Sequence, residues 1–219
     1  MDCRKSGRFS RCQSTGDFRG REKKELVGEV KNSGQEWQRE GQPDPVQVYD
    51  FPSLALGKAT PYGVYDLTRN EGWVSVGTDH DTAAFAAESI GRWWDYMGQN
   101  RYPDAQQLYI TADGGGSNGS RNRLWKVSLQ ALANRTKLTI HVSHFPPGTS
   151  KWNKIEHRLF AFISLNWRGR ALRTYATIVN CIANTHTDAG LTVTVQAQLD
   201  TTVYPTGIRV DDGTMAGLS

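Results

Sequence analysis

The sequence predicts an α/β fold in which a mixed sheet carries helices on both faces. The first observation is a run of three strand-like segments at 25–30, 62–67 and 72–77, the last two joined by a turn at Arg69-Asn70-Glu71-Gly72. The second is a later alternation of strands and helices, which is typical of parallel strands joined by crossover helices. The third is an apolar fraction of 37% in 219 residues, enough for one buried core.

Each later element has a local signal of its own. Thr82 is placed to cap a helix that runs to about Met97, because apolar residues follow it at helical spacing. The further elements predicted are strands at 107–112 and 138–142, helices at 121–134, 151–167 and 173–184, and a strand-like tail at 191–195. Three antiparallel strands followed by βαβα is the order expected of an RNase H-like fold.

The chain divides into three segments by composition. Residues 1–22 hold almost no large apolar side chains and show no periodicity, so we expect them to be disordered. We expect residues 23–185 to form the RNase H-like domain and residues 186–219 to form a C-terminal extension of that domain.

The cysteine pattern and the hydropathy argue against a disulfide-stabilised secreted protein and against a membrane-spanning protein. Cys3, Cys12 and Cys181 have neither metal-ligand spacing nor the pattern of a disulfide framework, so we expect a protein of the reducing cytoplasm. No apolar run approaches the roughly 18–20 residues of a membrane helix, and no membrane partner is expected.

Charge is distributed unevenly along the chain. The total is 26 Lys and Arg against 22 Asp and Glu, a net charge of +4. Residues 115–175 nevertheless hold eleven basic residues and a single acid, Glu156, whereas residues 41–114 hold four basic residues against ten acids. A basic segment of this kind predicts a surface that faces a polyanion such as DNA. A solvated basic helix face is the alternative.

Two carboxylates stand at positions suited to metal-dependent chemistry. Asp113 ends the strand at 107–112 and precedes three glycines, which leave its carboxylate accessible. Glu156 lies on a helix that begins after the break at Pro146-Pro147. We expect the two side chains to converge despite the 42 residues between them, since paired carboxylates suit Mg²⁺. An ordinary loop in which Asp113 bonds its own backbone is the alternative.

Basic side chains recur near these two carboxylates. Lys151, Lys154 and Arg158 have helical spacing around the helix carboxylate and are candidates for contacts with DNA phosphates. Arg121 and Arg123, at the start of the preceding helix, are further candidates for DNA binding.

The segment Asp79-His80-Asp81-Thr82 admits two interpretations. Metal binding through its two aspartates is one of them. A strand-to-helix turn capped by Asp81 or Thr82 is the other, and it is favoured because these residue types commonly begin helices.

Five blocks of sequence, in order, resemble one known family. They are KKELVG, PYGVYDL, NEGWVSVGTDHDTAAFA, ITADGGGSNGSR and HFPPGTSKWNKIEHRLFAFISLNWRG. Together they are similar to the Rhodopirellula-type DDE transposase domain of bacterial insertion sequences over about residues 23–210, and the last block also resembles the wider mariner-like superfamily.

The resemblance implies a site and a reaction. In this family two Asp and one Glu on an RNase H-like core bind a divalent metal, Mg²⁺ or Mn²⁺, for DNA strand cleavage and transfer. Asp113 falls on the second Asp and Glu156 on the Glu. The implied partners are DNA, at the insertion-sequence ends and at the target, and further copies in a homo-oligomer. The implied location is the bacterial cytoplasm, in association with the nucleoid.

The first Asp of the family pattern has no counterpart here. The corresponding position is Gly20, and Asp17 and Glu22 stand at the wrong spacing on a strand to replace it. We therefore expect a truncated first strand and a fragment that is inactive as a transposase, with a non-enzymatic DNA-binding or inert remnant as the alternative. Because the resemblance stops abruptly before Lys23, residues 1–22 are interpreted as the product of a reading-frame error.

Overall fold

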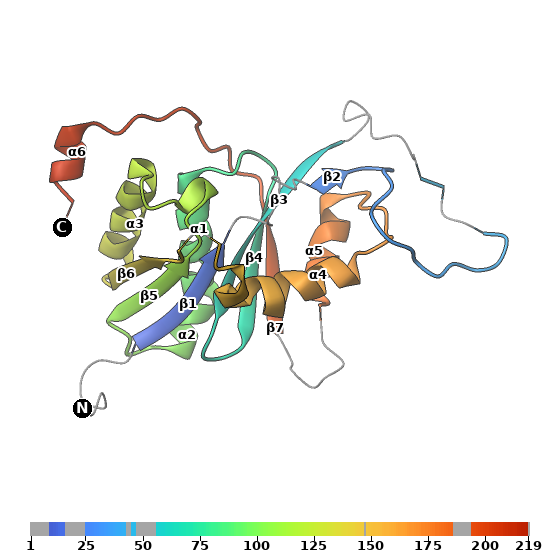
Figure 1. The fold of residues 1–219 in the computed structure, drawn as a ribbon, viewed down its shortest axis with the longest axis horizontal. Helices are drawn as coiled ribbons and strands as arrows, with labels where there is room; N and C mark the ends of the chain where they lie inside the picture. The colour runs from blue at the N-terminus through green and yellow to red at the C-terminus, as the bar shows by residue number, and fades with distance from the viewer. Residues whose placement is uncertain are drawn as a thin grey trace.

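The computed structural model describes residues 9–15, 25–42, 45–46, 56–146, 148–185 and 194–218. The strands are β1 (Phe9–Thr15), β2 (Glu25–Val27), β3 (Gly57–Asp66), β4 (Glu71–Gly77), β5 (Gln107–Ala112), β6 (Thr139–His144) and β7 (Thr194–Asp200). They form one sheet in the order β6-β5-β1-β3-β4-β7, with β2 paired to β3 outside this row (Figure 1).

Antiparallel and parallel pairs both occur in the sheet. β3 pairs antiparallel with β4, from Thr60 opposite Gly77 to Asp66 opposite Glu71. β1 is antiparallel to β3 and parallel to β5, and β6 is parallel to β5. The row β4-β3-β1-β5-β6 therefore combines an antiparallel meander with two parallel strands, and the predicted RNase H-like mixed sheet is confirmed.

The first strand differs from the prediction. We expected residues 1–22 to be disordered and the first strand to be truncated, but β1 lies between β3 and β5 in the middle of the sheet. The predicted strand at 25–30 is β2, which is three residues long and pairs with the outer end of β3. Without β1, two rows of backbone N–H and C=O groups would lack partners, and any extended segment can satisfy them. Residues 1–8 and 16–22 lie outside the described residues.

Helices and helical turns lie on both faces of the sheet. They are α1 (Ala83–Trp93), η2 (Trp94–Gly98), α2 (Gln99–Arg101), η3 (Gly116–Asn118), α3 (Arg123–Thr136), η4 (Ser150–Trp152), η5 (Glu156–Phe160), α4 (Ala161–Asn166), α5 (Tyr175–Ala183) and α6 (Asp212–Ala216). α1 and α3 pack together on one face, whereas η5, α4 and α5 cover the other face over β3, β4 and β7.

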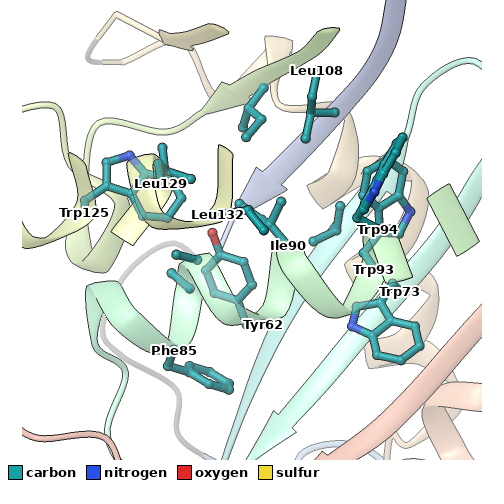
Figure 2. Close-up of a cluster of buried hydrophobic side chains, with 14 of the residues drawn as sticks. Tyr62, Trp73, Phe85, Ile90, Trp93, Trp94, Leu108, Trp125, Leu129 and Leu132 are labelled. Atoms are coloured by element: carbon teal, nitrogen blue, oxygen red, sulfur yellow. The ribbon is translucent and has the colours of Figure 1, made fainter. Parts of the chain in front are cut away.

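Alternation along β3 and β4 divides their apolar side chains between two cores. Tyr62 and Val64 of β3 join Trp73 of β4 in the core beneath α1 and α3 (Figure 2). Tyr65 of β3 and Val74 of β4 belong to the second core, beneath η5, α4 and α5. The central strands are thus buried on both faces, as the predicted three-layer arrangement requires.

The predicted helix boundaries are confirmed in part. Thr82 caps α1, since its hydroxyl oxygen accepts a hydrogen bond from the Phe85 N–H at 3.2 Å. The helix predicted to reach Met97 continues from α1 into the π-helical turn η2. The helix predicted at 151–167 is divided: η4 is a 3₁₀ turn, and the later helix contains the π-helical turn η5, which begins at Glu156.

The C-terminal residues complete the sheet and connect it to α1. β7 runs parallel to β4, and Asp200 at its end is 1% exposed. Its carboxylate lies 3.1 Å from the Arg92 guanidinium, accepts the Thr202 N–H at 2.9 Å and accepts the Tyr204 hydroxyl at 2.7 Å. Burial raises the pKa of Asp200, but the hydrogen bonds and the Arg92 charge outweigh burial and leave that pKa below its usual value.

Asp200→Asn should lower the free energy of unfolding at pH 7 by about 2 kcal/mol, because a charged hydrogen-bond acceptor is lost from a buried site. The folded pKa of Asp200 is depressed, so its contribution is present above the unfolded pKa of about 3.9 and is lost as pH falls through the folded pKa. Urea unfolding of the variant and the wild type should therefore give a difference that shrinks below about pH 4. Asp95→Asn, which removes an exposed partner of Arg135, is the control and should cost less than about 1 kcal/mol.

Candidate active site and nucleic-acid interface

Asp113 follows the last residue of β5 and is held by a neighbouring amide. The Ala112 carbonyl accepts the Phe145 N–H at 2.9 Å, which fixes the strand up to this point. Asn118 is 1% exposed, and when its amide is assigned so that the nitrogen faces acceptors, this nitrogen lies 3.1 Å from Asp113 Oδ1 and 2.7 Å from the Gly115 carbonyl oxygen. A buried donor therefore orients the Asp113 carboxylate.

His144 ties the same loop to the end of β6. Its Nε2 lies 2.8 Å from the backbone carbonyl oxygen of Asn118, an acceptor that requires the Nε2–H form of the ring. Residues on two parallel strands thus brace the glycine-rich loop at 114–119. Neither Asn118 nor His144 was predicted as a site residue. Asn118 could have been noticed in the sequence, because it is a polar residue in the glycine-rich loop that follows Asp113.

Glu156 begins the π-helical turn η5 and is half-buried. Its neighbours Ile155 and Leu159 are fully buried against the sheet. A Cβ added to Gly63 of β3 would lie 2.6 Å from Phe160 Cζ and 3.1 Å from Ile155 Cδ1, and one added to Gly72 of β4 would lie 2.8 Å from Leu159 Cδ1. Glycine at these two positions therefore sets how closely the Glu156 helix approaches the strands.

Strand pairing relates the two carboxylate positions. Gly63 of β3 pairs with Thr15 of β1, and Ser14 of β1 pairs with Ala112 of β5. Asp113 therefore continues β5 at the level of Thr15, two strands from the glycine on which Ile155 packs. Neighbouring strands are about 4.8 Å apart, so the backbones at these two positions are separated by about 10 Å. Both carboxylate-bearing segments lie at the same end of the sheet, on either side of the end of β1.

The third acidic position of the family pattern is not supplied by β1. The residue between the two carboxylate-bearing segments is Thr15, and Phe9–Thr15 contains no Asp or Glu. Within the described parts of the chain, no three His, Cys, Asp or Glu side chains form a group that could hold a metal ion. Gly20, Asp17 and Glu22, which the sequence singled out, lie outside the described residues. Asp113 and Glu156 provide two carboxylates, whereas the metal site that the resemblance implies needs three. The described residues therefore do not fit that metal site.

The turn at Asp79 has the structural role that the sequence favoured. The Asp79 carboxylate accepts the Tyr204 N–H at 2.9 Å and lies 2.5 Å from His80 Nδ1. The backbone hydrogen bond from Tyr204 is the main reason that the pKa of Asp79 lies below its usual value. With Thr82 as the helix cap, this segment joins β4, α1 and the C-terminal residues.

The basic residues predicted to contact DNA are found in two settings. Lys151, Lys154 and Arg158 are exposed around Glu156, and no carboxylate within the described ranges pairs with them. Arg121 is exposed at the start of the α3 region. Arg123 is instead engaged with the C-terminal segment, at 2.6 Å from Asp212 Oδ1 and 3.1 Å from the Val210 carbonyl oxygen.

Ion pairs also account for other charges of the basic segment 115–175. They are Arg135 with Asp95 at 2.7 Å, Arg170 with Glu36 at 2.8 Å and Arg173 with Glu29 at 3.2 Å. The acidic partners come from earlier parts of the chain, so the sequence composition of one segment could not reveal them. Among the described residues, the basic side chains without an acidic partner therefore occupy a smaller part of the surface than the composition of residues 115–175 indicated.

A family model for the Rhodopirellula transposase DDE domain matches residues 20–219. The chain belongs to this family. The matched residues of the DDE domain include Asp113, Glu156 and all five basic candidates, whereas β1 lies outside the match. The strand between the two carboxylate-bearing segments is thus built from sequence outside the family match.

The chain was also compared with solved structures and with curated proteins. A chain of the cryo-EM structure of the simian T-cell lymphotropic virus intasome in complex with PP2A regulatory subunit B56 gamma matches with a TM-score of 0.37 and 12% identity. The match covers 92% of this DDE domain chain and 60% of that chain. No curated protein matches significantly. Among the described residues, no helix is long and apolar enough to cross a bilayer.

Gly63→Ala should displace the Glu156 helix from the sheet. The added methyl group meets Phe160 at 2.6 Å, and overpacking of this kind typically costs about 1–3 kcal/mol. Thermal and urea unfolding would measure the loss. Gly217→Ala is the matched control, since its Cβ would lie 3.6 Å from the nearest heavy atom, the Thr214 carbonyl oxygen. Equal stability of the two variants would contradict the assigned role of Gly63.

Proposed function

We propose that this chain is an insertion-sequence transposase domain that binds DNA but does not cleave it. The observation that carries the proposal is the arrangement at one end of the sheet. Exposed Lys151, Lys154 and Arg158 surround Glu156, while β1 offers Thr15 where a third acidic ligand would be needed. Membership of the DDE transposase family supplies the reaction class, which is metal-dependent phosphodiester cleavage and strand transfer.

The metal chemistry of the family needs more ligands than this chain provides in its described part. Two ions that clamp the attacking and leaving oxygens require several carboxylate ligands between them. Asp113 and Glu156 supply two carboxylates, and no acidic residue stands on β1. DNA binding without cleavage is therefore the function proposed for this chain. A homo-oligomer and a nucleoid-associated location in the bacterial cytoplasm are part of the same proposal.

The altered first strand is proposed to come from a reading-frame error upstream of Lys23. Two observations support this origin: the family match begins at residue 20, and β1 lies before it. The nucleotide sequence of the gene is the direct test. A neighbouring frame that does not encode an apolar strand ending in Asp would contradict the proposed origin.

DNA binding should depend on phosphate contacts around Glu156. Lys154→Ala combined with Arg158→Ala should weaken binding to any duplex and reduce the slope of log K against log salt by about 2, roughly one per lost phosphate contact. Fluorescence anisotropy across a salt series measures both effects. Arg170→Ala is the control, because its guanidinium is paired with Glu36 at 2.8 Å. An unchanged slope in the double variant would contradict the phosphate contacts and would support the alternative, a basic helix face that is only exposed to solvent.

A carboxylate restored to β1 should improve metal binding. Thr15→Asp places an acid on the strand position that pairs with Gly63, between the segments of Asp113 and Glu156. We expect affinity for Mn²⁺, measured by calorimetry, to rise about tenfold or more with the added charged ligand. Ser14→Asp, at the neighbouring position that pairs with Val64, is the control and should give no gain. Equal Mn²⁺ affinities for both variants and the wild type would contradict the proposed geometry.

A further inference from the structure

Trp152 is exposed four residues before Glu156, unlike most tryptophans of this chain. Five of the seven tryptophans are buried in the two cores. The exceptions are Trp37, which is 100% exposed, and Trp152, which is 50% exposed. Trp37 lies in the segment at 31–42, next to the ion pair of Glu36 with Arg170, whereas Trp152 precedes Glu156 by four residues. An indole left half in water costs hydrophobic stabilisation unless a partner covers it.

The backbone of Trp152 is fixed on both sides. Its N–H donates to the Thr149 carbonyl oxygen at 2.9 Å, and the Thr149 hydroxyl donates to the Pro146 carbonyl oxygen at 2.6 Å. On the other side, Asn153 and Ile155 are buried, and Ile155 is the residue that packs on the sheet. The ring is therefore presented by a short, well-braced turn rather than by a long loop.

The surroundings of Trp152 are cationic rather than apolar. Lys151 and Lys154 are exposed on either side of it, and His157 and Arg158 are exposed one turn further along. The next exposed large apolar side chain of this helical region is Leu165, near the far end of α4. A protein partner would be expected to meet a larger apolar surface, whereas a single aromatic ring among Lys and Arg side chains is typical of sites for single-stranded nucleic acid.

We propose that Trp152 is a stacking platform for an unpaired DNA base beside Asp113 and Glu156. The ring would stack on the face of the base, while Lys151 and Lys154 contact the phosphates on either side of it. Bases within an intact duplex present only their edges, so this contact requires a base that is unpaired at a strand end, a nick or a distorted site. The inference rests on the proposed function and deepens it by naming a form of DNA that this end of the sheet prefers.

The test compares binding of the full chain to three labelled DNAs by anisotropy: a single strand, a blunt-ended duplex, and the same duplex with an unpaired tail. Trp152→Ala should weaken binding to the single strand and to the tailed duplex by about 5- to 150-fold, the range for loss of one base–aromatic stack. Binding to the blunt-ended duplex should change less than about twofold, because it has no unpaired base to stack. Trp152→Phe should retain much of the single-strand affinity, and Trp37→Ala should retain all of it.

The outcomes separate this inference from the proposed function. If wild-type protein binds none of the DNAs, the proposed function fails and the stacking site fails with it. If wild-type protein binds them all and Trp152→Ala weakens every one equally, or weakens none, only the stacking site is overturned. A shift of the variant from oligomer to monomer in sedimentation, with single-strand affinity intact, would assign the ring to an interface between copies and would also overturn it.

Discussion

The close contact between the Glu156 helix and the sheet is the constraint on which the candidate site depends. Gly63 and Gly72 lie on adjacent strands, and a methyl group at either would meet Phe160, Ile155 or Leu159 at about 3 Å or less. The missing side chains allow the first turns of the helix to rest on the strands, with Ile155 and Leu159 buried on either side of the half-buried Glu156. The position of the Glu156 segment over β3 and β4 follows from this contact, and Lys154 and Arg158 of the same segment stay exposed.

The centre of the sheet shows that backbone pairing and side-chain chemistry place separate demands on a strand. β1 joins β3 and β5 through a regular ladder, antiparallel on one side and parallel on the other. Those hydrogen bonds involve main-chain groups and do not depend on the residue types FSRCQST. A metal site would instead depend on the side chains, and Phe9–Thr15 contains no Asp or Glu. The central place of β1 in the sheet therefore depends on its main-chain pairing and not on its residue types.

Most of the fold could be predicted from the sequence, because its elements carry strong local signals. The hairpin of β3 and β4, the cap at Thr82 and the strand that ends before Asp113 all lie where the residue pattern placed them. β1 was missed because its polar composition gives no strand signal and its partners are distant in the sequence. The supports of Asp113 were missed for a related reason, since the contacts from Asn118 and His144 depend on the path of a glycine-rich loop. The sequence overestimated the free positive charge of residues 115–175. Arg123 and Arg170 form ion pairs with acids from other segments, and the composition of one segment cannot reveal such partners.

The parallel pairing of β7 with β4 has a consequence for how the chain is made. The outer edge of β4 is synthesised early, but its partner follows only after 116 further residues, between Gly77 and Thr194. At a synthesis rate of about 10 residues per second this interval is roughly ten seconds. During that time the nascent chain on the ribosome presents an apolar strand edge with unsatisfied main-chain groups, to which a neighbouring nascent chain on the same messenger can add a strand. Completion of the sheet, and protection of this edge from aggregation, thus waits until β7 has emerged.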